Sequence, residues 1–156
     1  MLTFGAIVVA NVVWPALFLE MRLLSWWIIL IGLAVELPFV RLLTGFDWQR
    51  AAIADLAMNA ASTIIGILLI PIFGLAWEYA ADFTLYRYWK VGTFNPVAWV
   101  ATLVLAVTLN AIIEQSVLRW GFRQRLGARG FAWLSVANGL SVGLALWSVF
   151  QNPPRP

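Results

Sequence analysis

Polar residues suited to binding protons or cations occur twice in this 156-residue chain, in the same order and at nearly the same spacing. Glu36 lies five residues before Arg41, and Glu114 lies five residues before Arg119. An Asn-x-x-Ser-x-x-x-small pattern follows each glutamate, formed by Asn59, Ser62 and Gly66 in the first set and by Asn138, Ser141 and Ala145 in the second. Glu114 follows Glu36 by 78 positions and Asn138 follows Asn59 by 79, so one inserted residue falls in a loop. This spacing predicts an internal repeat.

These residue types suit the handling of protons and cations. Two carboxyl groups that approach each other in an apolar environment can share a proton, and acids inside a membrane often mark proton or cation paths. Asp55 lies four residues before Asn59, and Asn110 lies four residues before Glu114, so each pair shares one face of a helix. We therefore predict a polar layer within the inner leaflet of the membrane. Its members are Glu36, Glu114, Asn59, Asn138, Ser62, Ser141, Asp55 and Asn110.

A structural role fits the same residues. Glu36 and Glu114 could pair with Arg119 and Arg41 across a pseudo-twofold axis, while asparagine and serine side chains bridge helices and small residues let backbones approach. Arg41 and Arg119 also lie near the ends of apolar segments, where long cationic side chains reach the membrane surface. We expect these two arginines to be interface anchors. For the two glutamates, the structural and the functional interpretation both stay open.

The elements that must position these residues are long apolar segments. The chain is 63% hydrophobic and 11% charged, whereas a soluble domain is about 45–50% apolar and about 25% charged. This composition predicts an integral membrane protein and excludes a soluble enzyme and a disordered chain. The apolar residues form continuous runs rather than alternating segments of about ten residues, which excludes a transmembrane β-barrel.

A transmembrane helix needs roughly 17–25 apolar residues. Four such spans are predicted at 23–40, 51–76, 97–118 and 131–150, and residues 2–19 form a fifth span or a kinked membrane segment. We expect an all-α, polytopic transmembrane bundle of four to five spans with two parallel helical-hairpin repeats. The single membrane domain (1–156) then consists of the N-terminal segment (1–22), repeat 1 (23–76), an outer interfacial aromatic segment (77–96), repeat 2 (97–150) and an extended tail (151–156).

The cationic residues predict an orientation in the membrane. Six of the ten fall on one side of the predicted spans, which favours the cytoplasm for that side. These six are Arg41, Arg50, Arg119, Arg123, Arg125 and Arg129. We expect a multi-pass protein of a prokaryotic-type inner membrane, with a cytoplasmic N-terminus and an outer C-terminus. The ten tryptophans supply side chains for belts at both membrane surfaces.

The absence of cysteine and histidine restricts the chemistry. It removes thiolate nucleophiles, imidazole ligation of haem, and zinc sites built on cysteine or histidine. The acidic residues are too dispersed in the sequence to predict a carboxylate metal cluster. We therefore predict a protein that is not an enzyme, with no catalytic residues, cofactor or metal. No basic folded module indicates binding to nucleic acid.

Two functions remain. The first is a non-catalytic accessory or scaffold subunit that packs within a larger inner-membrane complex, because the predicted loops are short and nearly every span carries apolar surface. The alternative is a small proton- or cation-coupled transporter or channel that uses the pseudosymmetric layer of glutamate, asparagine and serine. The partners predicted in these cases are the lipid bilayer together with other membrane-protein subunits, or a second copy of the chain in a homo-oligomer.

Overall fold

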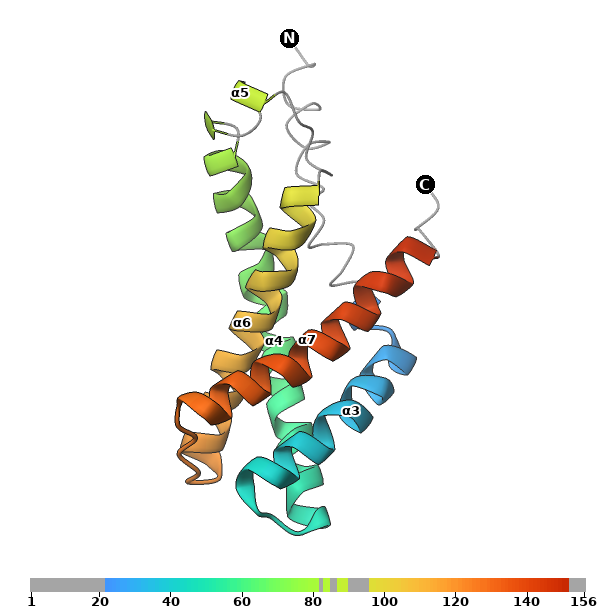
Figure 1. Cartoon of the computed structure of the whole chain (residues 1–156), viewed down its shortest axis with the longest axis vertical. Coiled ribbons are helices and arrows are strands. Elements are labelled where there is room, and N and C mark those ends of the chain that lie inside the picture. The colour runs from blue at the N-terminus through green and yellow to red at the C-terminus, as the bar shows by residue number, and fades with distance from the viewer. Residues whose placement is uncertain (1–21, 82, 85–86, 90–95, 152–156) are drawn as a thin grey trace.

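The computed structural model describes residues 22–81, 83–84, 87–89 and 96–151, and over these ranges the protein is built from helices (Figure 1). The predicted N-terminal span, part of the aromatic segment and the tail after residue 151 lie outside the described residues. The four long helices are α3 (Trp26–Thr44), α4 (Trp48–Ala81), α6 (Pro96–Gly121) and α7 (Ala128–Gln151), and α5 (Arg87–Trp89) is a single short turn.

Each of the four long helices is long and apolar enough to cross a membrane. The candidate spans are Trp26–Thr44, Trp48–Leu69, Trp99–Gly121 and Ala128–Gln151. The shortest has 19 residues, which corresponds to about 28 Å at 1.5 Å per residue and matches a hydrocarbon layer of about 30 Å. The prediction of a multi-pass, helical membrane protein is confirmed. α4 continues to Ala81, beyond the predicted end of the first hairpin at residue 76.

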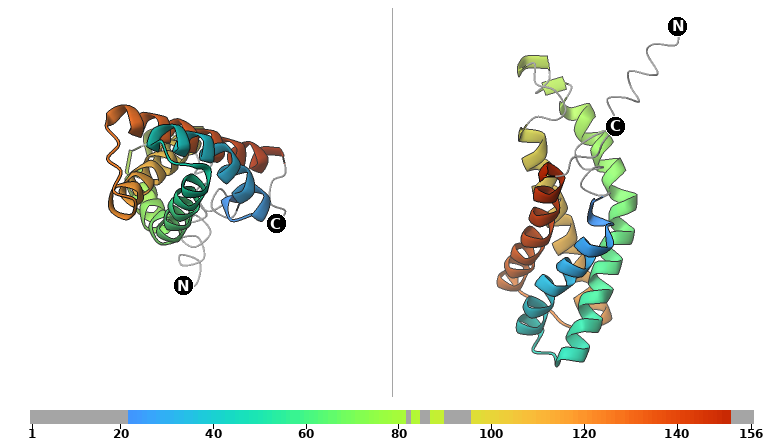
Figure 2. Two further views of the ribbon diagram at one scale, coloured as in Figure 1. Left: turned by 90° about the horizontal axis from the view of Figure 1, so that it is seen from below. Right: turned by 90° about the vertical axis from the view of Figure 1, so that its right-hand side faces the viewer.

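The four helices pack in a ring in the order α3, α4, α6, α7 and back to α3. Within the described residues, α3 does not pack against α6, and α4 does not pack against α7. The α3–α4 loop and the α6–α7 loop lie at the same end of the bundle, which we call the loop end (Figures 1 and 2). α3 and α6 therefore run toward the loop end, and α4 and α7 run away from it.

Local hydrogen bonds fix the turn between α3 and α4. Gly45 caps α3 in the left-handed region, at φ 70°, and its N–H donates to the carbonyl oxygen of Arg41 at 2.9 Å. Glycine adopts this conformation without the steric penalty that a side chain brings. Asp47 accepts a hydrogen bond of 2.8 Å from the N–H of Arg50, which satisfies one of the free donors at the start of α4. The turn thus sets the rotation of α4 relative to α3.

The buried apolar residues form two clusters at different depths. The cluster nearer the loop end contains Val40, Phe46, Ala51, Ala54, Met58, Ala111, Leu118 and Leu134. The second cluster contains Ile28, Ala106, Val142 and Ala145. Many members are small, which allows helix backbones to approach closely. Large apolar side chains such as Leu42, Leu68, Val100 and Trp147 are exposed on all four helices, as contact with lipid requires. Along α3 and α7, the predicted polar residues Glu36, Asn138 and Ser141 lie between the two clusters, whereas Asp55 and Glu114 are flanked by residues of the cluster nearer the loop end.

Candidate functional site

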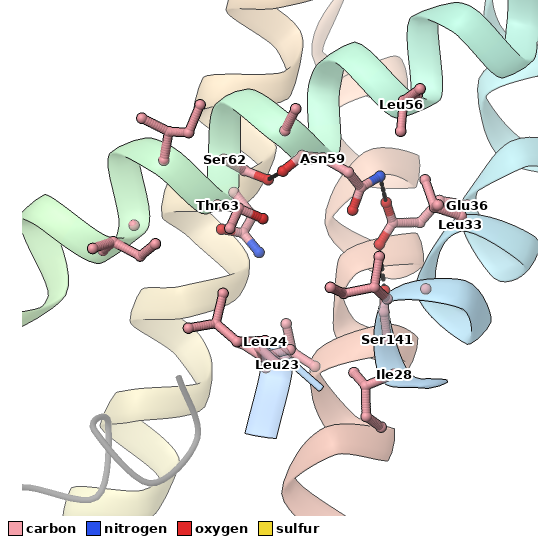
Figure 3. A pocket seen from close by; sticks show the side chains of 18 residues that line it. Leu23, Leu24, Ile28, Leu33, Glu36, Leu56, Asn59, Ser62, Thr63 and Ser141 are labelled. Atoms are coloured by element: carbon pink, nitrogen blue, oxygen red, sulfur yellow. Dashed lines mark hydrogen bonds between the residues drawn. The ribbon is translucent and has the colours of Figure 1, made fainter. Parts of the chain in front are cut away.

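Glu36 joins three helices through its carboxyl group. It lies on α3 and is only 4% exposed. The Nδ2 atom of Asn59, on α4, donates to Oε2 of Glu36 at 2.8 Å, and the hydroxyl of Ser141, on α7, donates to Oε1. Figure 3 shows Asn59 and Ser141 approaching this carboxyl group from two sides. Asn59 also contacts Oδ1 of Asp55, one turn away on α4, at 3.2 Å.

Glu114 occupies the corresponding place on α6 and is 1% exposed. The Nδ2 atom of Asn138, on α7, donates to its Oε2 at 2.5 Å and also to the carbonyl oxygen of Leu134 at 3.1 Å. The other carboxyl oxygen, Oε1, is buried and has no hydrogen-bond partner within the described part of the chain. Glu114 is therefore a fully buried acid that is bonded on one side only.

Helix α7 connects the two glutamates. Asn138 and Ser141 are three residues apart on one helix face, and each donates to a different glutamate. The side chains of Glu36, Asp55, Asn59, Glu114, Asn138 and Ser141 thus form one polar layer across all four helices, which we call the carboxylate belt. All six belong to the predicted polar layer.

The other two predicted members lie beside the belt. Ser62 is buried but donates to the carbonyl oxygen of Asn59 at 3.1 Å rather than to a glutamate. Asn110 is partly buried and lines the same cavity as Ser62. Ser62 corresponds in sequence to Ser141, yet only Ser141 contacts a carboxyl group.

The three carboxyl groups of the belt are buried, and no arginine or lysine of the described residues lies beside them. Asp55 is 2% exposed, and in the described part of the chain the three acids accept hydrogen bonds from amide and hydroxyl donors. Arg41 and Arg119 are exposed near the loop end, where their guanidinium groups lie 4.2 Å from the ring centre of Trp48 and 5.9 Å from that of Trp120. The Glu–Arg pairs that the structural alternative requires are therefore not formed within the described residues.

A cavity of about 360 Å³ lies between α3 and α4 and reaches the belt at Glu36, Asn59 and Ser141 (Figure 3). Apolar side chains form most of its wall, and Ser62 and Thr63 add hydroxyl groups. Its volume falls within the range of small-molecule sites, roughly 300–1,000 Å³. We did not predict this cavity from the sequence. The signal that could have indicated it is a run of small residues on the relevant face of α4, because small side chains leave room beside a helix.

Ser141 lies in a segment, Gly-Leu-Ser-Val-Gly at 139–143, that matches the letters of the GxSxG motif of serine hydrolases. In those enzymes the serine sits on a sharp turn between a strand and a helix. Here the segment is in the middle of α7, and the Ser141 hydroxyl also donates to the carbonyl oxygen of Ala137 at 2.9 Å. Backbone N–H groups inside a helix are already bonded and cannot form an oxyanion hole. The match therefore does not build a nucleophile elbow.

Comparison with protein-family models, with curated proteins and with solved structures finds no match to this chain.

The two equivalent serines provide a matched test of the belt. Ser141→Ala removes a hydrogen bond to a buried carboxyl group, whereas Ser62→Ala removes only a bond within one helix. Interhelical polar bonds in membrane proteins contribute about 0.6 kcal/mol on average and up to about 1.7 kcal/mol. We expect Ser141→Ala to lower the free energy of unfolding by about 1 kcal/mol and Ser62→Ala to lower it much less. Unfolding titrations in mixed micelles measure both, and equal losses would contradict the assigned contacts.

Proposed function

We propose that the protein is a small membrane transporter in which the carboxylate belt takes up and releases a proton or a cation. The observation that carries this proposal is the burial of Glu36, Asp55 and Glu114 among neutral donors, without an adjacent arginine or lysine in the described residues. A carboxyl group in hydrocarbon is costly unless it is protonated or faces a cation. Binding of a proton or a cation would therefore lower the energetic cost of burying each of these acids.

The cavity between α3 and α4 supports the proposal because it supplies an approach to Glu36. Its polar lining consists of carboxylate, amide and hydroxyl groups, whose oxygen atoms are suitable ligands for a small cation. Glu36, Asn59 and Ser141 meet at its wall, so an ion in the cavity would contact groups from three helices. Movement of any one helix would then alter the site.

Burial supports the proposal that the two hairpins are structural repeats. Residues at corresponding positions of α3 and α6, offset by 78, are buried in both helices. They are Ile28, Glu36 and Val40 on α3 and Ala106, Glu114 and Leu118 on α6. The same holds for α4 and α7 at an offset of 79. The buried residues on α4 are Ala51, Asp55, Met58 and Ser62, and their buried counterparts on α7 are Gly130, Leu134, Ala137 and Ser141. The same faces therefore point inward in both hairpins, as in transporters built from parallel repeats.

The two glutamates differ in how they are bonded. Both carboxyl oxygens of Glu36 accept hydrogen bonds, whereas one oxygen of Glu114 has no partner in the described part of the chain. In a repeat, Ser62 is the counterpart of Ser141 and would be the missing donor to Glu114. We propose that these two arrangements correspond to two states through which each glutamate passes during transport.

The accessory-subunit role stays a prediction without a specific contact in its favour. Its main support was apolar surface on nearly every span, and exposed apolar side chains are equally required for contact with lipid. Three buried acids, with no arginine or lysine beside them in the described residues, destabilise a scaffold and add nothing to its packing. We therefore place the transporter first. We further propose that the loop end, with its exposed arginines, faces the cytoplasm.

Proteoliposomes that contain either a pH-sensitive dye or a dye sensitive to the cation under test measure the proposed function. The wild-type protein is expected to move protons or monovalent cations when a membrane potential is applied. The double variant Glu36→Gln with Glu114→Gln keeps the size of both side chains and should reduce this flux at least tenfold. Asp47→Asn is the matched control, because Asp47 is exposed in the α3–α4 turn and asparagine is an equally good helix cap.

Wild-type flux in the double variant would reject the belt as the ion site. If the double variant elutes as aggregate, the single variants decide instead, since each retains the other hairpin's Glu–Asn pair. Unchanged flux in both folded single variants, or no flux in the wild-type protein with any small cation, would also reject the proposal.

A further inference from the structure

A second hollow lies at the loop end, away from the carboxylate belt. It has a volume of about 480 Å³ and lies between the end of α3 and the start of α7, beneath the α6–α7 loop. We call it the loop-end groove. Its principal lining residues are Phe39, Leu42, Arg125, Leu126, Arg129 and Trp133. None of them belongs to the belt.

Two arginines are the charged residues of this groove, and no acidic side chain lines it among the described residues. Arg125 lies in the α6–α7 loop, and Arg129 lies in the first turn of α7. Both are exposed, so both can reach a ligand at the membrane surface. The groove therefore presents two positive charges to an anionic group.

The other side chains that line the groove are largely apolar and aromatic. The rings of Phe39 and Trp133 lie 6.1 Å apart between centres, and Leu42 is 82% exposed. A soluble anion such as free phosphate gains nothing from these side chains. A phospholipid uses both kinds of side chain, because its phosphate can pair with arginine while its acyl chains lie against the apolar side chains.

The loop that carries Arg125 is held in place. Nε2 of Gln115, on α6, donates to the carbonyl oxygen of Leu126 at 2.9 Å. The Leu126 side chain lies so close to Gly130 that a Cβ atom added at Gly130 would be 2.7 Å from Cβ of Leu126. Only glycine permits this approach without displacement, so the groove wall next to Arg125 is a fixed part of the fold.

We propose that the loop-end groove binds the headgroup of an anionic phospholipid. Arg125 and Arg129 pair with the phosphate-bearing headgroup, and Leu42 and Trp133 contact the start of the acyl chains. Basic pockets between transmembrane helices bind anionic lipids elsewhere on the same principle. This site shares no residue with the proposed ion site, so each proposal can fail without the other.

Native mass spectrometry of the purified protein in a neutral detergent tests this inference, with dioleoyl phosphatidylglycerol and dioleoyl phosphatidylcholine as probes. The wild-type protein should retain the anionic lipid in preference to the zwitterionic one. Arg125→Gln with Arg129→Gln should weaken retention of the anionic lipid about 30-fold, at about fivefold per arginine. The control variant, Arg119→Gln with Arg123→Gln, removes two arginines near the same loop that do not line the groove, and it should retain the lipid.

Three results would overturn the inference. Equal retention of the two lipids by the wild-type protein would show that charge does not select the ligand. An equal loss in the control variant would show that total charge near the loop, rather than the groove, attracts the lipid. Displacement of the bound lipid by excess inorganic phosphate would show that the site binds a soluble anion.

Discussion

Replacing Asn138 with alanine is expected to destabilise the protein by about 3 kcal/mol, more than the equivalent replacement of Asn59. Asn138 is the donor to Glu114, which is 1% exposed and whose second oxygen has no partner within the described residues. Without Asn138, this carboxyl group is buried with no donor beside it. Asn59→Ala, made in an Asp55→Asn background so that no second buried acid loses its donor, should cost only about 1 kcal/mol, because Glu36 retains its hydrogen bond from Ser141.

Thermal unfolding in detergent, together with a double-mutant cycle, measures this difference. Glu114→Leu in the Asn138→Ala background removes the buried acid along with its lost donor and should restore much of the stability. Similar losses for Asn138→Ala and Asn59→Ala, with no recovery on replacing Glu114, would contradict the assigned bonding. The comparison is matched because both substitutions are Asn→Ala at corresponding positions of α4 and α7.

Replacing Asp55 with asparagine is expected to have two opposite effects. Asp55 is 2% exposed, and its carboxyl group contacts Asn59 at 3.2 Å. Removal of an acid from a membrane interior should stabilise the fold by about 2 kcal/mol, and asparagine keeps the acceptor oxygen. The corresponding position on α7 is Leu134, so packing in a hairpin of this type does not need a carboxylate there. If the belt carries the ion, the same change should also lower flux. A residue that destabilises the fold but is needed for transport would show this combination of effects.

The experiment compares Asp55→Asn with Asp47→Asn, which removes a carboxylate from an exposed turn. Unfolding midpoints and proteoliposome flux are measured for both variants. A more stable, less active Asp55→Asn protein supports the proposal, while Asp47→Asn should leave both quantities near those of the wild type. A destabilised Asp55→Asn protein with full flux would assign Asp55 a purely structural role.

Much of the bundle could be predicted from apolar segments and polar spacing. The repeat pattern placed each glutamate and asparagine at a similar depth on neighbouring helices, and the structure brings Asn59 to Glu36 and Asn138 to Glu114. The bond between Ser141 and Glu36 could not be predicted. These residues are 105 positions apart, and helix neighbours in a membrane are hard to infer when both the lipid-facing and the inward surfaces are apolar.

The positions of Arg41 and Arg119 and the cavity beside Glu36 depend on how the helices are arranged in space. The alternative in which each glutamate pairs with an arginine required Arg41 and Arg119 to turn inward. An arginine five residues after a glutamate is rotated about 140° around the helix from it, and both arginines lie near the loop end against tryptophan rings. The cavity beside Glu36 depends on the separation of α3 from α4, and the small residues on the lining face of α4 do not by themselves set that separation.

In the proposed transporter, Glu36 and Glu114 exchange a proton or cation within the membrane. Infrared difference spectroscopy of the protein in lipid, recorded as pH is changed and as the transported cation is added, observes this exchange at the carboxyl groups themselves. We expect a protonated-carboxyl band that decreases when protons are removed or the cation is added, and that is reduced in each single Glu→Gln variant. A carboxyl spectrum that is unchanged by both pH and cation, or a responsive band that keeps its full intensity in the Glu36→Gln, Glu114→Gln double variant, would contradict this proposal.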